Sequence, residues 1–513
     1  MPPQKPFPVT SHVRRRADSS LLMLALLTVG IGALGSVALI EAVHVGDTYQ
    51  VTHVSGAWMA LAKYADQGTL YPPLYDGHAY GGTRYMPLQI LINAAASHTT
   101  GEYLVSAKLV AYGLMALLLA VLFTVLTRHF ELPTPLALAS VAAVLVANAL
   151  RFSATSIGAD TLAVTLQLAA VALICSSRTR LITTTAALLC VLAFLSKVTA
   201  VWAPAAIMIW LATRDRRRLA EFAASFLLPL GLSLGLLEAA TEGRFFANVF
   251  GLGTATLLPF QEAVVEAPKK FLLFLDASGL AISMIFPFAL LGLGLAVAQR
   301  RVSLYHLSFG VSFLVLLFVL TDRGAAYNQF IDVEVLSVLV AADLVRQSAL
   351  RSRGLSILGS AFAVALIWGI GLSFVVNLNG EFKDALRTVV GRPHTAYPTS
   401  PVDGYVSRND RVLSQDPYVP VSLGALPVVL DAYMFRQITL EHPRWADQLV
   451  DRLDAGQFDK IVMFRHVGAH GELDSADPYW RTNHFGPAVV GAIVRNYRPL
   501  ANANGYWIYA RRR

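Results

Sequence analysis

The chain has 513 residues, of which 55% are apolar and only 14% are charged, with a formal net charge of +8 at pH 7. Soluble proteins carry about 25% charged residues, so this composition excludes an ordinary soluble protein and predicts a polytopic membrane protein. The basic excess does not indicate binding to nucleic acid, because the arginines alternate with apolar segments and form no single patch.

The first predicted element is a membrane helix. Residues 1–19 are polar and rich in proline, and they include the basic run Arg14–Arg16. The following run, Leu21–Ile40, contains no charge and is long enough to span a bilayer. A cleaved signal peptide is the alternative, but its apolar core should cover only about 7–15 residues before a small-residue cleavage site. We therefore expect a cytoplasmic tail over 1–19 and a retained anchor helix.

Further apolar segments predict a membrane domain over residues 20–378. These candidate spans lie at about 104–126, 135–150, 158–176, 181–196, 198–213, 219–239, 276–298, 303–320, 329–346 and 354–377. With the first helix they predict about eleven transmembrane helices.

The basic clusters predict the orientation of these helices. With the N-terminus in the cytoplasm, every short basic loop falls on the inner side, as the positive-inside rule requires. The residues concerned are Arg14–Arg16, Arg128, Arg178, Arg180, Arg214, Arg216–Arg218, Arg300, Arg301, Arg346, Arg351 and Arg353. An odd number of spans then places the C-terminal part outside, and we expect a multi-pass protein of the plasma (inner) membrane.

The segment after the first helix, residues 41–102, is predicted to be a large outer loop. It is polar from Glu41 to Tyr85 and carries a Pro-Pro turn and a Gly-Gly-Thr-Arg-Tyr sequence. Long loops without an evident structural purpose are usually functional. Asp47 is the candidate base, since a carboxylate facing water can accept the proton of an acceptor hydroxyl or amine. A helix N-cap is the alternative role for Asp47, and Glu41 and then Asp76 are the reserve candidates for the base.

Isolated polar residues at the predicted outer ends of the spans complete the candidate site. Charged groups near a bilayer are costly and usually face a cavity or a partner, although a side chain that snorkels to the interface is the simpler alternative for each. Arginine and lysine among them are suited to a phosphate or pyrophosphate. The set comprises Arg84 and Tyr85 in the loop, and Arg151, Asp160, Lys197, Arg244, Asn248, Asp322, Arg323 and Asn328 at the ends of spans.

No metal, cofactor or disulfide is predicted. The loop histidines His44, His53 and His78 match no zinc spacing. The two cysteines, Cys175 and Cys190, lie in apolar runs and are expected to be small buried hydrophobic residues. The chain has neither a Gly-Lys-Ser/Thr phosphate loop nor a Gly-x-Ser-x-Gly elbow, which disfavours ATP-driven transport and serine hydrolysis.

Residues 379–513 are predicted to form a small α/β domain on the outer face. Residues 381–513 hold about 30 charged side chains, which is typical of a soluble domain, and they begin with the linker GRPHTAYPTSP. Short apolar runs predict strands at Arg411–Ser414, Pro427–Leu430, Lys460–Phe464 and Tyr506–Ala510. Helical patterns cover about 441–455 and 485–496.

With these residues in view, the chain resembles the GT-C superfamily of membrane glycosyltransferases, most closely the protein O-mannosyltransferases and lipid A aminoarabinose transferases of family 39. The resemblance covers most of residues 20–340. It is carried by GDTYQ, ADQGTLYPPLYDG and TRYMPLQI in the first loop, and by SIGADTLAV, AFLSKVTAV, EGRFFANV and RGAAYNQFIDVE further on. Family members often have paired acids in the first loop, whereas Thr48 follows Asp47 here.

The resemblance implies a helical GT-C core and a polyprenyl-phosphate-sugar donor. It implies an inverting transfer of a hexose or pentose to a lipid, glycan or protein acceptor on the outer face, with Asp47 as base. A transporter or a flippase of lipid-linked sugars is the alternative, and a non-catalytic envelope assembly protein is a third. Charges that converge on an outer cavity would favour the transferase, and a pocket at the membrane midplane would favour transport.

Overall fold

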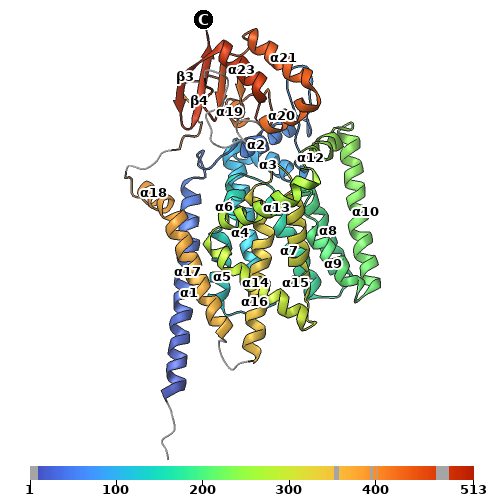
Figure 1. Ribbon diagram of the computed structural model, residues 1–513, viewed down its shortest axis with the longest axis vertical. Helices are drawn as coiled ribbons and strands as arrows, with labels where there is room; N and C mark the ends of the chain where they lie inside the picture. The colour runs from blue at the N-terminus through green and yellow to red at the C-terminus, as the bar shows by residue number, and fades with distance from the viewer. Residues whose placement is uncertain (1–9, 352–356, 393–396, 401, 469–483, 513) are drawn as a thin grey trace, which may run out of the picture.

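The computed structural model describes residues 10–351, 357–392, 397–400, 402–468 and 484–512. Part of the expected tail, Arg353 and part of the linker at 391–401 lie outside these ranges. The described chain is mainly helical and ends in a small sheet, so the predicted fold class, a helical membrane protein with a small α/β region, is confirmed (Figure 1).

Twelve main helices make up the body below the sheet (Figure 1). They are α1 (Thr10–Val43), α4 (Tyr103–Arg128), α5 (Thr134–Leu145), α6 (Asn148–Thr155), α7 (Asp160–Ser176), α8 (Arg180–Ser196), α9 (Trp202–Ala212), α10 (Arg216–Ala240), α14 (Leu280–Ala298), α15 (Leu304–Val319), α16 (Ile331–Arg351) and α17 (Ile357–Ser373). Other elements connect them: α11 (Arg244–Phe246), η1 (Ala247–Gly251), α12 (Leu252–Ala255), the 18-residue helix α13 (Phe260–Ala277) and η2 (Tyr327–Phe330).

The predicted count of about eleven spans is not confirmed. In the described chain, five helical stretches are long and apolar enough to cross a bilayer: Ser20–Val43, Tyr103–Arg128, Arg216–Ala240, Leu280–Ala298 and Ile357–Val389. The pair α5 and α6 adds a sixth only if its 60° bend lies within one span. Four other predicted spans, α7, α8, α9 and α15, are apolar helices of 10–17 residues. Helices of about 20 residues are needed to cross the hydrocarbon core upright.

Small residues allow the helices of the body to pack closely. A Cβ atom on Gly30 of α1 would lie 3.3 Å from the backbone nitrogen of Ala139 in α5. A Cβ atom on Gly369 of α17 would lie 2.8 Å from the Cα atom of Ala281 in α14. Because a bilayer supplies no hydrophobic drive between helices, such close contacts are the main source of their packing energy.

The predicted outer loop is itself partly helical. It contains α2 (His53–Asp66) and α3 (Pro87–Thr100), which lie beneath the sheet domain (Figure 1). A reciprocal capping box between Thr52 and Ser55 begins α2, and Pro87 begins α3. Gly101 ends α3 with a left-handed backbone of φ 76°, which glycine adopts without strain. This segment is therefore a fixed scaffold that can hold side chains in place.

The C-terminal region forms a four-stranded mixed sheet with the order β1-β2-β4-β3. Its strands are β1 (Val412–Ser414), β2 (Lys460–Met463), β3 (Tyr497–Ala503) and β4 (Tyr506–Arg511). Its helices are α19 (Tyr418–Ser422), α20 (Ala432–Glu441), α21 (Pro443–Asp454) and α23 (Gly486–Asn496). The predicted helices over 441–455 and 485–496 are confirmed, while β3, α19 and α20 were not predicted. Before this region, α17 continues through η3 (Phe374–Leu378) into α18 (Asn379–Val389).

One strand prediction is wrong. Residues Pro427–Leu430 do not join the sheet; instead, Val429 bridges Tyr80 of the outer segment. The amide of Tyr80 donates to the carbonyl of Val428 at 2.7 Å, and the amide of Leu430 donates to the carbonyl of Tyr80 at 2.9 Å. The backbone of this apolar run therefore forms hydrogen bonds with the outer segment, and these bonds dock the sheet domain onto that segment. The hydroxyl of Tyr80 strengthens this docking by donating to the carbonyl of Trp445 at 2.8 Å.

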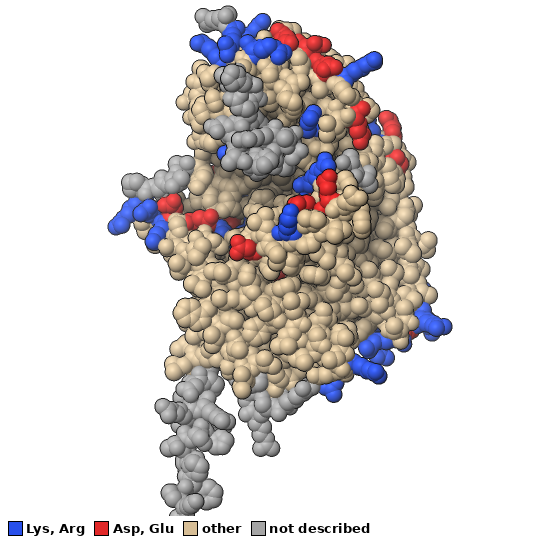
Figure 2. All heavy atoms as spheres, in the orientation of Figure 1, with Lys and Arg blue, Asp and Glu red and all other residues tan. Residues whose placement is uncertain are grey.

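Charged side chains are distributed unevenly over the surface. Figure 2 shows that they are concentrated on and below the sheet domain and again at the opposite end of the body, where Lys and Arg predominate. The surface between these zones is almost free of charge on this face (Figure 2). This pattern is that of a membrane protein whose apolar belt faces lipid. Which end faces the cytoplasm stays a prediction.

Candidate active site

A cavity of about 650 Å³ lies between the helical body and the outer segment, at the end of the body that carries the sheet domain. Its polar lining comes from the ends of several elements: Arg84 and Tyr85 before α3, Asp160 at the start of α7, Lys197 at the end of α8, Asp322 after α15, and Asn328 in η2. All six were predicted to lie at the outer ends of spans or in the outer loop. The structure thus brings them together around one space.

Asp160 and Lys197 form the first charged pair of this cavity. The Nζ atom of Lys197 lies 2.5 Å from Oδ1 of Asp160. The Nδ2 atom of Asn328 donates to Oδ2 of Asp160 at 3.0 Å, and the hydroxyl of Ser153 donates to the same oxygen at 3.4 Å. Both charged side chains are mostly buried, with 9% of Asp160 and 17% of Lys197 exposed. The carboxylate is therefore fixed in position and partly desolvated.

Arg84 and Asp322 form the second charged pair. One guanidinium nitrogen of Arg84 contacts Oδ2 of Asp322 and donates to the hydroxyl of Thr256 at 3.2 Å. The amide of Gly324 donates to Oδ1 of Asp322 at 2.7 Å and so holds the carboxylate. The guanidinium also lies 5.8 Å from the ring centroid of Tyr433 in α20, so the sheet domain supports the cavity wall.

The remaining lining is largely apolar. Trp58 and Tyr85 stack with their ring centroids 4.3 Å apart and form one wall. On another side the lining includes Leu314 and Phe318 of α15, which are 66% and 64% exposed. Exposed apolar side chains on a helix of the body are suited to contact with lipid. The cavity therefore combines two charged pairs with an apolar flank.

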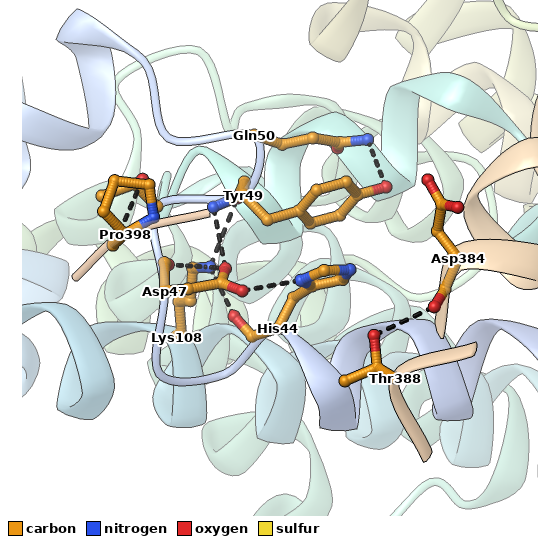
Figure 3. A network of polar contacts seen from close by, with 9 residues as sticks. His44, Asp47, Tyr49, Gln50, Lys108, Asp384, Thr388 and Pro398 are labelled. Atoms are coloured by element: carbon orange, nitrogen blue, oxygen red, sulfur yellow. Dashed lines mark hydrogen bonds and ion pairs between the residues drawn. The ribbon is translucent and has the colours of Figure 1, made fainter. Parts of the chain in front are cut away.

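Asp47 does not line this cavity. It lies in a separate polar network beyond the end of α1 (Figure 3). Its Oδ2 atom is 2.7 Å from Nδ1 of His44, and its Oδ1 atom accepts a hydrogen bond from the amide of Tyr49 at 2.9 Å. Its carboxylate is also 3.7 Å from Nζ of Lys108. Both carboxylate oxygens are thus engaged in holding the turn.

Lys108 is the centre of that network. Its side chain is fully buried, and its ammonium donates to the backbone carbonyls of His44, Asp47 and Tyr49 at 2.7, 2.6 and 3.3 Å. Thr48 in the same turn donates from its hydroxyl to the carbonyl of Pro398 at 2.8 Å. The arrangement fixes the chain as it leaves α1 and ties it to the segment that leads into the sheet domain.

The other predicted residues also lie away from the cavity lining. Glu41 is buried at the end of α1, near Arg151, which pairs with Glu381 of α18.

Asn248 is fully buried. Its side chain accepts from the amide of Thr83 at 3.0 Å and donates to the carbonyl of Arg244 at 2.8 Å, so it supports the backbone beside Arg84. Arg244, one-third exposed, lies 3.8 Å from Glu242. Arg323 is exposed, and its amide donates to the carbonyl of Thr256. Asp76 caps the turn at His78 and Ala79.

Trp58 and Tyr433, like the apolar residues Leu314 and Phe318, were not predicted as site residues. Trp58 lies inside α2, where an apolar residue on a helix gives no functional signal, and Tyr433 lies more than 300 residues after Arg84 in the sequence. Among the described residues, no group of three or more His, Cys, Asp or Glu side chains is arranged to hold a metal ion.

No family model matches the sequence, and no curated protein matches it. The fold, however, matches solved structures. ArnT from Cupriavidus metallidurans bound to undecaprenyl phosphate aligns over 93% of this chain and 97% of its own, with a TM-score of 0.58 and 13% identity. The archaeal oligosaccharyltransferase AglB from Archaeoglobus fulgidus, in complex with an inhibitory peptide and a dolichol-phosphate, aligns over 86% of this chain and 69% of its own, with a TM-score of 0.51 and 12% identity.

Both neighbours are glycosyltransferases of the GT-C superfamily. This chain therefore has a GT-C fold, as its sequence motifs predicted. At such low identity the similarity concerns the fold, and the chemistry of this chain has to be argued from its own cavity.

Proposed function

We propose that the chain is a glycosyltransferase that moves a hexose or pentose from a polyprenyl-phosphate-sugar donor to a lipid, glycan or protein acceptor. The reaction takes place on the face of the membrane that carries the sheet domain. The observation that carries this proposal is the composition of the 650 Å³ cavity, which joins charged pairs to an apolar flank on α15. A lipid-linked phosphate sugar has the same two parts, a charged head and an apolar chain.

The charged pairs have distinct roles in this proposal. The ammonium of Lys197 and the guanidinium of Arg84 bind the donor phosphate, for which Lys supplies a compact charge and Arg a fork of donors. They stabilise the charge that grows on the phosphate as the bond between the anomeric carbon and the phosphate oxygen breaks. The stacked rings of Trp58 and Tyr85 offer the sugar an apolar face.

Asp160 is the base in this proposal. Asp160 and Asp322 are the carboxylates in the described lining, and Asp322 is held by Arg84 and by the amide of Gly324. When Lys197 turns toward the donor phosphate, Asp160 is left to accept the acceptor's proton as the new glycosidic bond forms. Attack opposite the leaving phosphate inverts the anomeric centre. The assignment of the base to Asp47 stays an untested sequence-based prediction, and the geometry favours Asp160.

The position of the cavity argues against the alternative function. A transporter or flippase would be expected to hold its charged groups near the midplane, between repeated halves. Here the charged pairs lie at the ends of helices on the side of the sheet domain, and part of the cavity wall is the outer segment. A site at one face fits transfer to an acceptor on that face.

The direct test uses the purified full chain in proteoliposomes. A panel of polyprenyl-phosphate sugars is supplied with a lipid extract as acceptor, and release of polyprenyl phosphate is followed. The proposal is supported if polyprenyl phosphate is released from one of the sugar donors and if Asp160→Asn abolishes this release. Sugar movement across the bilayer without release of polyprenyl phosphate would instead show a flippase.

A further inference from the structure

A second large cavity lies at the opposite end of the body from the sheet domain. Its volume is about 750 Å³, and arginines from several connections between helices line it. They are Arg128 at the end of α4, Arg178 between α7 and α8, Arg214 and Arg218 around the start of α10, and Arg346 near the end of α16. Only two carboxylates, Asp215 and Asp343, share the lining. The cavity therefore carries a net positive charge.

Part of this charge is neutralised or held within the protein. Arg218 is buried, where its guanidinium donates to the hydroxyl of Thr183 at 2.7 Å and to the carbonyl of Ser177 at 2.6 Å. Arg346 pairs with Asp343 at 2.9 Å. By contrast, none of Arg128, Arg178 and Arg214 has an ion-pair partner among the residues that the structure describes. Three cations thus line the space without an ion pair, and the carboxylate left beside them is Asp215, which caps the start of α10.

An apolar groove adjoins the basic cavity. It has a volume of about 270 Å³, shares Trp210 and Arg214 with the cavity, and is otherwise lined by Ile209, Thr213, Arg300, Val302 and Leu307. The guanidinium of Arg214 lies 3.5 Å from the ring centroid of Trp210, at the junction of the two spaces. Ile209 in the groove is 49% exposed. A ligand at this junction would meet positive charge on one side and an apolar surface on the other.

We propose that this cavity binds the phosphate of an anionic phospholipid headgroup, with an acyl chain along the adjoining groove. Arginine is suited to phosphate because its planar fork presents several donors, and basic pockets between membrane helices bind lipid headgroups. Arg128, Arg178 and Arg214 are exposed on the wall of this cavity, so a headgroup can reach them from solvent. Arg217 is 91% exposed but lies outside the cavity lining, so it is the reference for an arginine that only orients the protein.

The test compares two double variants with matched charge. Arg178→Gln with Arg214→Gln removes two cations from the cavity, and Arg217→Gln with Arg301→Gln removes two from the same end of the body outside its lining. The full chain is delipidated in detergent and titrated with phosphatidylglycerol, phosphatidylcholine or inorganic phosphate. Bound ligand is counted by native mass spectrometry.

Wild-type protein and the Arg217/Arg301 variant should bind phosphatidylglycerol with similar affinity and prefer it to phosphatidylcholine. The Arg178/Arg214 variant should bind it about tenfold or more weakly, because each arginine removes a charge-assisted contact. Equal loss in both variants, or equal affinity for the two lipids, would overturn the proposal. Saturable binding of inorganic phosphate without a preference for the anionic lipid would overturn the lipid as the source of the phosphate. A thermal unfolding curve of each variant checks that it is folded before its lipid affinity is compared with that of wild type.

Discussion

Lys197 and Asp160 are 37 residues apart in the sequence, yet Nζ of the lysine lies 2.5 Å from Oδ1 of the aspartate. The contact arises because α7 begins at Asp160 and the next helix, α8, ends just before Lys197, so that two antiparallel helices bring their outer ends together. Each residue alone would be a charge at the edge of a membrane. Together, at the wall of a cavity, they supply a cation for a phosphate and a carboxylate for a proton.

The first prediction concerns Asp160. Asn has nearly the same shape and can still accept from Asn328 and Ser153, but it cannot accept the acceptor's proton. We expect Asp160→Asn to lower kcat by about 10²–10⁴-fold, the usual range for a positioned acid–base group. Release of polyprenyl phosphate under saturating donor measures the loss. Turnover within a few-fold of wild type would remove Asp160 from the role of base.

Asp47→Asn is the matched variant, and it decides between the two carboxylates. In the structure the carboxylate of Asp47 contacts His44 and the amide of Tyr49, and it does not line the cavity. We therefore expect this variant, once folded, to keep turnover within a few-fold of wild type. A fall of about 10²–10⁴-fold in kcat, with binding of the donor intact, would return the role of base to Asp47.

The second prediction concerns binding of the donor. Lys197→Met keeps the length of the side chain but removes its charge. We expect the donor KM to rise by the equivalent of about 1.5–3 kcal/mol, as for the loss of a charge-assisted hydrogen bond. Arg244→Gln is the control, because Arg244 lies outside the cavity lining, one-third exposed and beside Glu242. A larger effect in Arg244→Gln than in Lys197→Met would show that the donor binds elsewhere.

The third prediction concerns the stability of the turn after α1. Lys108→Met leaves three buried backbone carbonyls without their donor. Each unsatisfied buried group costs about 1–3 kcal/mol, so we expect a loss of several kcal/mol or a failure to fold. Lys269→Met, at a side chain that is 66% exposed, should change stability by about 0.5 kcal/mol or less. Thermal unfolding in detergent measures both, and equal melting temperatures for the two variants would contradict the role given to Lys108.

The fourth prediction concerns pH and Asp416 in the sheet domain. Burial raises the pKa of Asp416 from 3.8 to about 6, although the hydroxyl of Tyr506 and the amide of Tyr418 both donate to its carboxylate and oppose the shift. The folded protein thus binds this proton more tightly than the unfolded chain. The contribution of Asp416 to the free energy of unfolding is full below about pH 4 and is lost as the pH rises through about 6.

Asp416→Asn removes this titration while keeping the shape of the side chain. The free energy of unfolding of wild type, relative to the variant, should fall by about 2 kcal/mol between pH 4 and pH 7, since one pKa unit corresponds to about 1.4 kcal/mol and the unfolded carboxyl is already partly ionised at pH 4. Urea unfolding of the full chain in detergent, followed by tryptophan fluorescence at each pH, measures the difference. A difference that stays constant across this range would show that Asp416 does not titrate there.

The fifth prediction concerns orientation. The arginine-lined cavity and the sheet domain lie at opposite ends of the body, so one of them faces the cytoplasm. The positive-inside rule places the arginines there. Cysteine labelling of intact cells should therefore reach the exposed positions 67 and 448 but not the exposed position 216. Labelling at 216 from outside the cell would reverse the proposed topology.

Much of the fold could be predicted from the sequence, because apolar runs and basic loops act locally. The charge-free run from Leu21, the confinement of basic clusters to alternate connections, and the change of composition near residue 380 each report a preference for lipid or water that does not depend on distant contacts. The same patterns placed Arg84, Tyr85, Asp160, Lys197 and Asn328 at the ends of elements that meet the cavity.

What the sequence could not decide was which of these end residues face a common space. Asp47 and Asp160 are both acids at the ends of predicted spans. Only the tertiary structure sets Asp47 beside Lys108 of α4 and, through the packing of α7 on α8, Asp160 beside Lys197. Likewise the apolar run at Pro427–Leu430 has the composition of a strand, but its partner is Tyr80 in a segment more than 300 residues away. Local sequence patterns determine which residues are buried and where helices end. The residue that pairs with a charge, or with the edge of a strand, depends on which distant elements pack together, and only the tertiary structure decides this.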